Sequence, residues 1–306
     1  MKTALLFSGQ GAQYVGMGQD LYLKSPEART LYEEADALLQ NGFSTVCFEG
    51  PEETLTDTSY CQPALYVHGL ALFAALKKER PDFSFQACAG LSLGEFTAHT
   101  VAGTFSFAEG LKLVAARGRL MQEACRATEG GMLTLIGASR EQAEALASQS
   151  GLQVANYNCP GQIVLSGAKS LVPNAVEQGK ALGLKRCLPL NVAGAYHSRL
   201  MQPAQDALAP LILAAPLQTP SVPVFSNVTG QVASDVATVR DTLTRQVTGS
   251  VRWEECVEGL ISSGCSRLIE LGPGRVLAGM VKRINKDVPC LSAGNLEELQ
   301  ALLPQL

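Results

Sequence analysis

A short glycine-flanked serine segment is the strongest chemical signal in the sequence. Gly90-Leu91-Ser92-Leu93-Gly94 fits the pattern G-x-S-x-G, in which a nucleophilic serine stands on a sharp turn between a strand and a helix. An apolar strand is predicted at residues 85–89, and a helix is predicted to start at Leu93. The backbone N–H of Leu93 would then lie at a helix N-terminus, where it can stabilise an oxyanion. The alternative is that Ser92 only caps this helix.

A nucleophilic serine needs a base, and the chain has three histidines. His68 lies among alanines and leucines and is expected to be a buried or edge residue. His99 follows Ser92 by two helical turns, roughly ten ångströms along the axis, which is out of reach. His197 lies in a loop of small residues and is the remaining candidate, although it could simply begin the next helix. No acid stands out as a third member, so the sequence favours a Ser/His pair.

Arg117 is a cation at the edge of an apolar helix face. At 100° per residue it falls about 60° from Val114. A guanidinium directed toward a core needs a carboxylate, which it can bind through two hydrogen bonds. That carboxylate can be an internal Asp or Glu, the commoner case, or it can belong to a ligand.

The segment Gly9-Gln10-Gly11 follows the first predicted strand and would line the carboxyl edge of a parallel sheet. It is not a phosphate-binding loop, because no Lys-Ser/Thr follows and the G-x-G-x-x-G spacing is missing. An amide at Gln10 could donate to an oxyanion, but this signal is weak by itself.

The elements that position these residues alternate between strand and helix, which predicts an α/β fold with a largely parallel sheet. Strands are predicted at residues 3–7, 85–89 and 267–271. Helix start signals are Pro26 after Ser25, Pro63 before an apolar run to residue 76, and a capping box of Ser106 with Glu109.

Between about residues 131 and 190 the pattern changes to β-α-β-β-α-β, the order of a small ferredoxin-like unit. Its predicted strands are 132–137, 153–157, 163–166 and 185–190, and its predicted helices are 139–147 and 170–182. The α/β pattern then resumes. We therefore predict a large subdomain of residues 1–127 and 195–306, with a small subdomain of residues 128–194 inserted into it.

Composition excludes several classes of protein. The 306 residues carry 24 Lys and Arg against 28 Asp and Glu, a net charge of −4, which argues against a nucleic-acid partner. Nine cysteines without C-x-x-C or metal-ligand spacing are typical of free thiols in a reducing cytoplasm. The N-terminal residues do not resemble a signal peptide, and the longest apolar stretch is too short to span a membrane.

Taken together, the motifs resemble a known family over nearly the whole chain. Besides the segments around Ser92, Gln10 and Arg117, they include Asn156 to Gln162, Gly194 to Met201 and Glu270 to Gly274. In this order they look like those of the malonyl-CoA:acyl carrier protein transacylases and related acyltransferases of polyketide synthesis. The resemblance implies that the large subdomain is α/β-hydrolase-like.

The resemblance also implies a role for individual residues. Ser92 would be acylated by malonyl-CoA in a ping-pong cycle, and His197 would move the proton of the nucleophile to the leaving thiol. A backbone carbonyl, placed by the resemblance at Gln246, would orient that histidine. The amides of Leu93 and Gln10 would form the oxyanion hole, and Arg117 would bind the malonyl carboxylate. Two further residues, Asn158 and Gln62, match positions near the substrate.

Two positions bear on substrate choice. Leu91 stands where the family usually has histidine, which removes a hydrogen-bonding side chain beside the carboxylate site. Tyr196 resembles the bulky aromatic residue associated with malonyl selection over methylmalonyl. A methylmalonyl-selective transferase and an acyl hydrolase that clears carrier proteins are the alternatives, and Arg117 counts against the hydrolase. A catalytically silent carrier-binding subunit would not need both Ser92 and His197.

The resemblance implies malonyl-CoA and an acyl carrier protein as substrates, with no cofactor and no metal. Carrier proteins of this kind are acidic, so we expect a basic docking surface. Its candidates are Lys185, Arg186, Lys282, Arg283 and Lys286, although a solvated charged face is the commoner explanation for any one of them. We expect a cytoplasmic monomer without a membrane or nucleic-acid partner.

Overall fold

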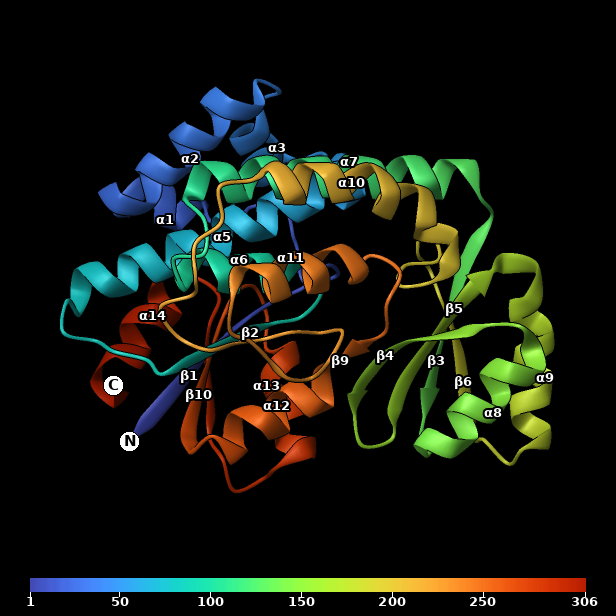
Figure 1. Ribbon diagram of the computed structural model, residues 1–306. Helices are drawn as coiled ribbons and strands as arrows, with labels where there is room; N and C mark the ends of the chain where they lie inside the picture. Colours follow the sequence, from blue (N-terminus) through green and yellow to red (C-terminus); the bar gives the residue numbers. More distant parts are fainter.

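A parallel sheet forms the centre of the larger part of the protein. In the computed structural model, which describes residues 1–306, its six strands lie in the order β11-β10-β1-β2-β7-β8. Figure 1 labels β1, β2 and β10 of this sheet. All neighbours run parallel except β7 and β8. The bounds are β1 Lys2–Phe7, β2 Ala87–Gly90, β7 Val224–Phe225, β8 Val232–Ala233, β10 Cys265–Leu271 and β11 Cys290–Ala293. The predicted α/β fold with a parallel sheet is confirmed.

The register of the central strands brings three loops together. Phe7 at the end of β1 pairs with Gly90 at the end of β2 and with Leu271 at the end of β10. The loops that follow these strands therefore leave from the same edge of the sheet. They carry Gln10, Ser92 and Gly272.

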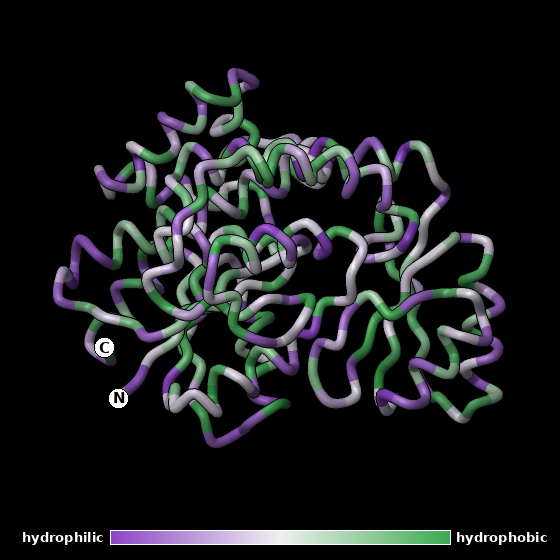
Figure 2. The backbone as a smooth tube through the Cα atoms, viewed as in Figure 1, coloured by the Kyte–Doolittle hydropathy of each residue, from purple (hydrophilic) through white to green (hydrophobic).

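Both faces of the sheet are covered, as alternate residues of β1 show. Leu5 and Phe7 belong to a core cluster of 53 buried residues, whereas Ala4 and Leu6 belong to a second cluster of 16. A strand buried on both faces is hydrophobic throughout, which explains the unbroken apolar segment in the sequence. Figure 2 shows how hydrophobic positions follow the interior elements while hydrophilic positions gather on outer turns.

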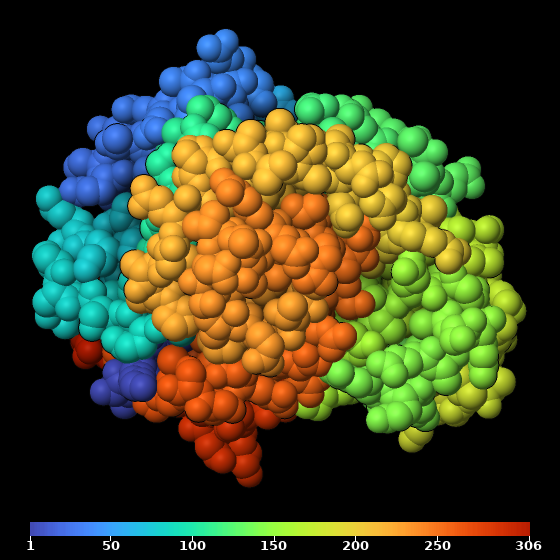
Figure 3. All heavy atoms as spheres, in the orientation of Figure 1, coloured from blue at the N-terminus to red at the C-terminus, as the bar shows by residue number.

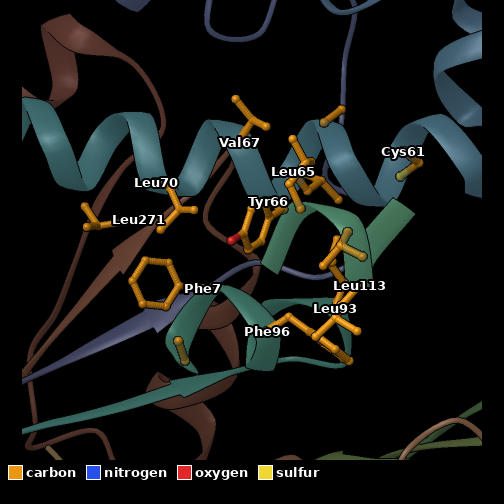
Figure 4. Packing of buried hydrophobic residues seen from close by; sticks show 14 of the residues in the cluster. Phe7, Cys61, Leu65, Tyr66, Val67, Leu70, Leu93, Phe96, Leu113 and Leu271 are labelled. Atoms are coloured by element: carbon orange, nitrogen blue, oxygen red, sulfur yellow. The ribbon is translucent and has the colours of Figure 1, made fainter. Parts of the chain in front are cut away.

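The helices that cover the sheet face of Leu5 and Phe7 supply most of the 53-residue cluster. Figure 4 shows Phe7 of β1 and Phe96 of α6 packed under Leu65 and Tyr66 of α5. The helices with residues in this cluster are α1 Gln19–Lys24, α2 Pro26–Leu39, α3 Phe43–Glu49, α4 Glu52–Thr56, α5 Thr58–Glu79, α6 Leu93–Val101, α7 Phe107–Ala127, α10 Gln202–Ala214, α11 Val236–Arg245 and α14 Leu296–Leu302. Helices α12 Trp253–Ser262 and α13 Val276–Ile284 supply the second cluster.

A second, mostly antiparallel sheet has the order β6-β3-β5-β4-β9. Its elements are β3 Gly130–Ile136, α8 Arg140–Ser150, β4 Gln153–Cys159, β5 Gln162–Ala168, α9 Val172–Ala181, β6 Arg186–Leu190 and β9 Val251–Arg252. Helices α8 and α9 cover one face around a cluster of 13 buried residues. In Figure 3 this part lies as a green-yellow lobe against the rest.

The two sheets are connected through a common hydrophobic core and through a strand, β9, that joins the second sheet from late in the chain. Val164 of β5 belongs to the large cluster, while its neighbours Ile163 and Leu165 belong to the small one, so this sheet is also buried on both faces. Strand β9, far along the chain, pairs parallel with β4. The β-α-β-β-α-β order agrees with the sequence, and the division at residues 128 and 194 stays a prediction.

Several element boundaries differ from the predictions. Helix α5 begins at Thr58, capped by the Asp57 side chain, so Pro63 lies inside it instead of opening it. The Ser106 side chain accepts a hydrogen bond from the Glu109 N–H, as a capping box requires. The second bond of the box, from the Ser106 N–H to the Glu109 side chain, is missing, because the Glu109 carboxylate pairs with Lys112 at 2.7 Å. Short 3-10 turns at Lys169–Leu171 and Arg199–Met201 precede α9 and α10. None of the helices combines the length and the apolar character that a bilayer crossing requires.

Candidate active site

Ser92 stands on a strained turn between β2 and α6. Its φ is 52° and its ψ −106°, a combination that L-residues rarely adopt. The turn needs glycine on both sides. A Cβ on Gly90 would lie 1.9 Å from the backbone of Gly94, and one on Gly94 would lie 2.2 Å from the Phe7 carbonyl oxygen. The G-x-S-x-G pattern therefore forms the sharp strand-to-helix turn that the sequence predicts.

His197 contacts the serine hydroxyl from a distant loop. Its Nε2 lies 2.8 Å from Ser92 Oγ, and its Nδ1 lies 2.9 Å from the Gln246 carbonyl oxygen and 3.2 Å from that of Gly249. Carbonyl oxygens only accept hydrogen bonds, so Nδ1 carries the proton and Nε2 is free to accept one from Ser92. Two carbonyls thus occupy the place where a triad would have an acid.

The surroundings of His197 keep it neutral. The side chain is buried, and burial, followed by the nearby charge of Arg117, lowers the pKa of His197 from 6.5 to about 4. At neutral pH the imidazole is therefore unprotonated, which is the state that a general base requires.

Arg117 is fully buried beside Ser92 and contacts no carboxylate. Its guanidinium donates to Gln62 Oε1 at 2.7 Å, to Gln246 Oε1 at 2.9 Å and to Ser92 Oγ at 3.1 Å. Its Nε has no hydrogen-bond partner, and it appears in none of the protein's salt bridges. Burial lowers the pKa of Arg117 to about 10, so the group remains a cation at neutral pH. The commoner expectation, an internal acid partner in contact, is wrong.

The two amides expected to form an oxyanion hole flank the serine. Leu93 is the first residue of α6, so its N–H has no carbonyl one turn back within the helix. The Gln10 side chain donates to Tyr196 Oη at 3.3 Å and to Thr58 Oγ1 at 3.4 Å, while its backbone N–H donates to no protein acceptor. The backbone amide of Gln10, and not its side chain, is thus the free donor.

A cavity of about 340 Å³ opens onto Ser92 between the two sheets. It is lined by eight of the ten predicted site residues, namely Gln10, Gln62, Leu91, Ser92, Leu93, Asn158, Tyr196 and His197. The other two, Arg117 and Gln246, lie behind Ser92 and reach it through their hydrogen bonds. The structure therefore gathers all ten predicted residues around one point.

The remaining lining residues differ in how they are held. Tyr196 is buried and its hydroxyl lies 2.7 Å from Thr58 Oγ1, which fixes its ring. Asn158 is buried with its Oδ1 unpaired. Leu91 presents an apolar side chain to the cavity and packs against Gly9.

Two residues that the sequence reasoning did not single out complete the site. Asn227 accepts from the Ser92 N–H at 2.6 Å and donates to the Gly90 carbonyl at 2.8 Å, so it holds the turn from the neighbouring strand. Glu95 is fully buried and accepts from Gln246 Nε2 at 2.5 Å and from the Asn227 N–H at 3.1 Å. A polar Ser-Asn pair directly after β7 was the one available signal for Asn227.

The other two histidines lie outside the site, as expected. His68 is buried and contacts the Gly294 carbonyl at 3.0 Å, and His99 contacts Thr104 Oγ1 at 3.0 Å. All nine cysteines are free thiols. The five basic candidates for docking are exposed, but Arg283 is held by the Pro160 carbonyl at 2.9 Å.

The chain is similar to known proteins over nearly its whole length. Residues 4–300 match the acyl transferase domain family. The chain is 39% identical to a malonyl CoA-acyl carrier protein transacylase of Bacillus subtilis (strain 168), covering 100% of this chain and 97% of that one. It is 37% identical to the protein of the same name from Staphylococcus aureus (strain MRSA252), over 98% of this chain and 97% of the relative.

Solved structures show the same similarity. An acyl-carrier-protein-S-malonyltransferase from Bartonella henselae superposes with a TM-score of 0.94 at 38% identity, over 100% of this chain and 99% of the other. A malonyl-transacylase solved in complex with a type II polyketide synthase acyl carrier protein gives a TM-score of 0.95 at 34% identity, over 100% of both chains.

Proposed function

The chain belongs to the malonyl CoA-acyl carrier protein transacylases within the acyl transferase family, and we propose that it moves a malonyl group from malonyl-CoA to the phosphopantetheine thiol of an acyl carrier protein. The group would travel as an ester on Ser92. One observation carries the proposal. Arg117 is a buried cation without a contacting carboxylate, 3.1 Å from the serine oxygen. An acyl group that ends in a carboxylate supplies the missing partner.

In the first half-reaction, His197 Nε2 accepts the Ser92 proton as Oγ attacks the thioester carbonyl. The backbone amides of Leu93 and Gln10 stabilise the resulting oxyanion. Collapse breaks the carbon–sulfur bond, and His197 returns the proton to the leaving sulfur, which releases CoA as a thiol. In the second half-reaction the carrier thiol gives its proton to His197, attacks the ester and regenerates Ser92. The reaction balances without a metal or a cofactor.

Arg117 favours malonyl over uncharged acyl groups, because an acetyl group would leave the buried guanidinium without an anionic partner. The fixed ring of Tyr196 beside the cavity limits room for an extra methyl group, which supports malonyl over methylmalonyl. One methyl group is worth about 1–3 kcal/mol of discrimination. Leu91 adds no hydrogen bond to the carboxylate, so Arg117, with Gln62 and Gln246 behind it, carries that binding.

A partner and a setting follow from this proposal. The acyl carrier protein is the second substrate, met at the cavity between the two sheets. We propose that the enzyme acts as a monomer in the cytoplasm, a reducing compartment that suits nine free thiols.

The decisive experiment is mass spectrometry of the protein after incubation with malonyl-CoA. We expect the mass of one malonyl group on the peptide that contains Ser92, and its disappearance when holo acyl carrier protein is added. Ser92→Ala should acquire no label. A label on another residue would contradict the assignment of the nucleophile, and rapid release of malonate into water without carrier would favour a hydrolase.

A further inference from the structure

The side chain and backbone of Gln246 connect all the charged and reacting groups of the site. Its Oε1 accepts from Arg117 at 2.9 Å, and its Nε2 donates to the Ser92 carbonyl at 2.9 Å and to Glu95 Oε2 at 2.5 Å. Its own carbonyl accepts from His197 Nδ1 at 2.9 Å. The side-chain amide of Gln246 therefore points its oxygen at the Arg117 cation and its N–H at the Glu95 carboxyl group.

Glu95 is an unusual group for this place. It is fully buried on α6, and the mechanism above does not use it. One of its oxygens, Oε1, has no hydrogen-bond partner, while the other accepts from Gln246 and from the Asn227 N–H. Arg117 touches no carboxylate, so Glu95 is the acid linked to it through a single intervening amide.

We propose that Glu95 is a positioning residue that balances the charge of Arg117 through Gln246 while the site is empty, and that it takes up a proton when the malonyl carboxylate binds Arg117. This inference rests on the proposed function. The carboxylate would bring a second anion to one buried cation. Two anions beside one cation repel each other strongly in a buried site. Glu95, whose countercharge is then taken by the substrate carboxylate, therefore binds a proton.

Glu95 is the group around this site that can respond in the neutral range. Burial raises the pKa of Glu95 to about 7, and a further anion would raise it more. The other titratable groups are Arg117 from α7, His197 beyond Gln246, Cys256 from α12 and Tyr196 beside the cavity, and burial raises the pKa of Tyr196 to about 12. Arg117 stays charged and His197 stays neutral at neutral pH, and burial raises the pKa of the Cys256 thiol well above its ordinary value.

The chemistry itself does not consume a proton below the pKa of the CoA thiol, because the Ser92 proton leaves on CoA. Net proton uptake therefore reports on the protein. The experiment mixes enzyme in excess with malonyl-CoA or acetyl-CoA at pH 7.5 in weak buffer with an indicator dye. We expect a fraction of one proton taken up per malonyl group and none per acetyl group, with complete acylation verified by mass. Equal uptake for both would overturn the proposal.

A variant gives a second readout. Glu95→Gln keeps an oxygen acceptor for Gln246 and Asn227 but removes the charge. In the unmodified enzyme, the ratio of kcat/KM for malonyl-CoA to that for acetyl-CoA should rise as the pH falls from 9 to 6, because protonated Glu95 no longer competes for Arg117. A coupling of one pKa unit gives about a tenfold change. In Glu95→Gln the ratio should be high and flat across this range.

The matched control is Glu109→Gln, which removes a carboxylate from the exposed start of α7. It should keep the pH dependence of the unmodified enzyme. If the ratio of kcat/KM for the two substrates changes with pH in the same way in Glu95→Gln as in the unmodified enzyme, the proposal is overturned and Glu95 serves only packing. If Ser92 does not become malonylated, the proposed function itself is contradicted. The failure of the Glu95 proposal and the failure of the proposed function therefore give different results.

Discussion

At the level of single residues, Arg117 stands out as a buried cation that contacts no carboxylate. A buried guanidinium normally has an acid in contact, because an unpaired charge in the interior is costly. Here two glutamine oxygens and the nucleophile accept its hydrogen bonds, and the Phe96 ring lies 5.6 Å from its central carbon. These neutral contacts hold the group in place but leave its charge available. We expect a substrate carboxylate to complete the arrangement.

Arg117→Ala should therefore separate charged from uncharged substrates. We expect kcat/KM for malonyl-CoA to fall by about ten- to a hundredfold, the value of one lost hydrogen bond to a charged group, at about 1.5–3 kcal/mol. The same parameter for acetyl-CoA should stay or rise. Arg119→Ala, which removes an exposed arginine of the same helix, is the control. An equal loss for both substrates would mean that Arg117 serves the fold.

We expect His197 to set the acid limb of the pH profile for acylation, below the range in which Glu95 responds. As the proposed general base, the imidazole is active in its neutral form, so activity should be lost as the pH falls through its pKa. With that pKa lowered from 6.5 to about 4, kcat/KM for malonyl-CoA should not fall between pH 8 and 5, and its acid limb should have a midpoint near 4. A midpoint near 6.5 would contradict the buried, neutral histidine.

The lowered pKa of His197 also affects the stability of the fold. The folded state must therefore be checked at each pH of the activity profile. In the unfolded chain the histidine titrates near 6.5, whereas the folded protein resists its protonation. The contribution of neutral His197 to stability is therefore complete above pH 6.5 and is lost as the pH falls below it. Circular dichroism at each pH distinguishes a protonated base from an unfolded protein.

At the level of elements, the turn between β2 and α6 depends on backbone contacts that exclude side chains. The end of β1 and the start of α6 approach each other so closely that no space remains for a Cβ on Gly94 beside the Phe7 carbonyl. Asn227, which follows β7, then fixes the turn from the neighbouring strand through its bonds to Ser92 and Gly90. The nucleophile is thus positioned by three neighbouring parallel strands.

Gly94→Ala tests this packing. Its Cβ would lie 2.2 Å from the Phe7 carbonyl oxygen, so the helix or the strand must shift, at a cost of about 1–3 kcal/mol in the free energy of unfolding. Gly279→Ala in α13 is the matched control, because nothing lies within 4 Å of its added Cβ. That control should gain about 0.5–1 kcal/mol from the lower entropy of the unfolded chain. Urea denaturation measures both, and similar effects would contradict the close approach.

At the level of the whole molecule, the cavity lies where the two sheets meet. Val276 and Met280 of α13 line it from one side, and Leu190 of β6 lines it from the other. The exposed Lys282 and Lys286 lie on α13 or just after it, so an acidic carrier that brings its thiol to Ser92 would pass near them.

Reversing these two charges should weaken carrier binding. In Lys282→Glu/Lys286→Glu we expect the KM for the carrier to rise, by up to about fivefold for each charge, and its dependence on salt to weaken. Acylation by a malonyl thioester that lacks the nucleotide should be unchanged. Lys24→Glu/Lys112→Glu, on α1 and α7, reverses the same charge elsewhere. Equal effects of the two double variants would exclude a local docking surface on α13.

The sequence alone predicted three strands of the parallel sheet, the β-α-β-β-α-β order of the smaller unit and the turn around Ser92. These follow from local periodicity and from glycine spacing, which act over a few residues. Its weakest predictions were boundaries such as the start of α5, where the Asp57 cap outweighed the proline signal. Residue chemistry alone proposed five of the ten candidate residues, and the resemblance added Gln246, Leu91, Asn158, Gln62 and Tyr196. The roles of all ten stay predictions until the variants are measured.

Only the tertiary structure decided which groups touch. Ser92 and His197 are 105 positions apart, and Glu95 and Gln246 are 151 apart, so no local pattern encodes their contacts. The absence of an acid beside Arg117, the carbonyl partners of His197 and the bonds of Asn227 to the turn all depend on how the loops leave the sheet edge. Local sequence therefore encodes the turn that carries Ser92, whereas the contacts of Ser92 with His197 and Arg117 arise where distant segments pack together.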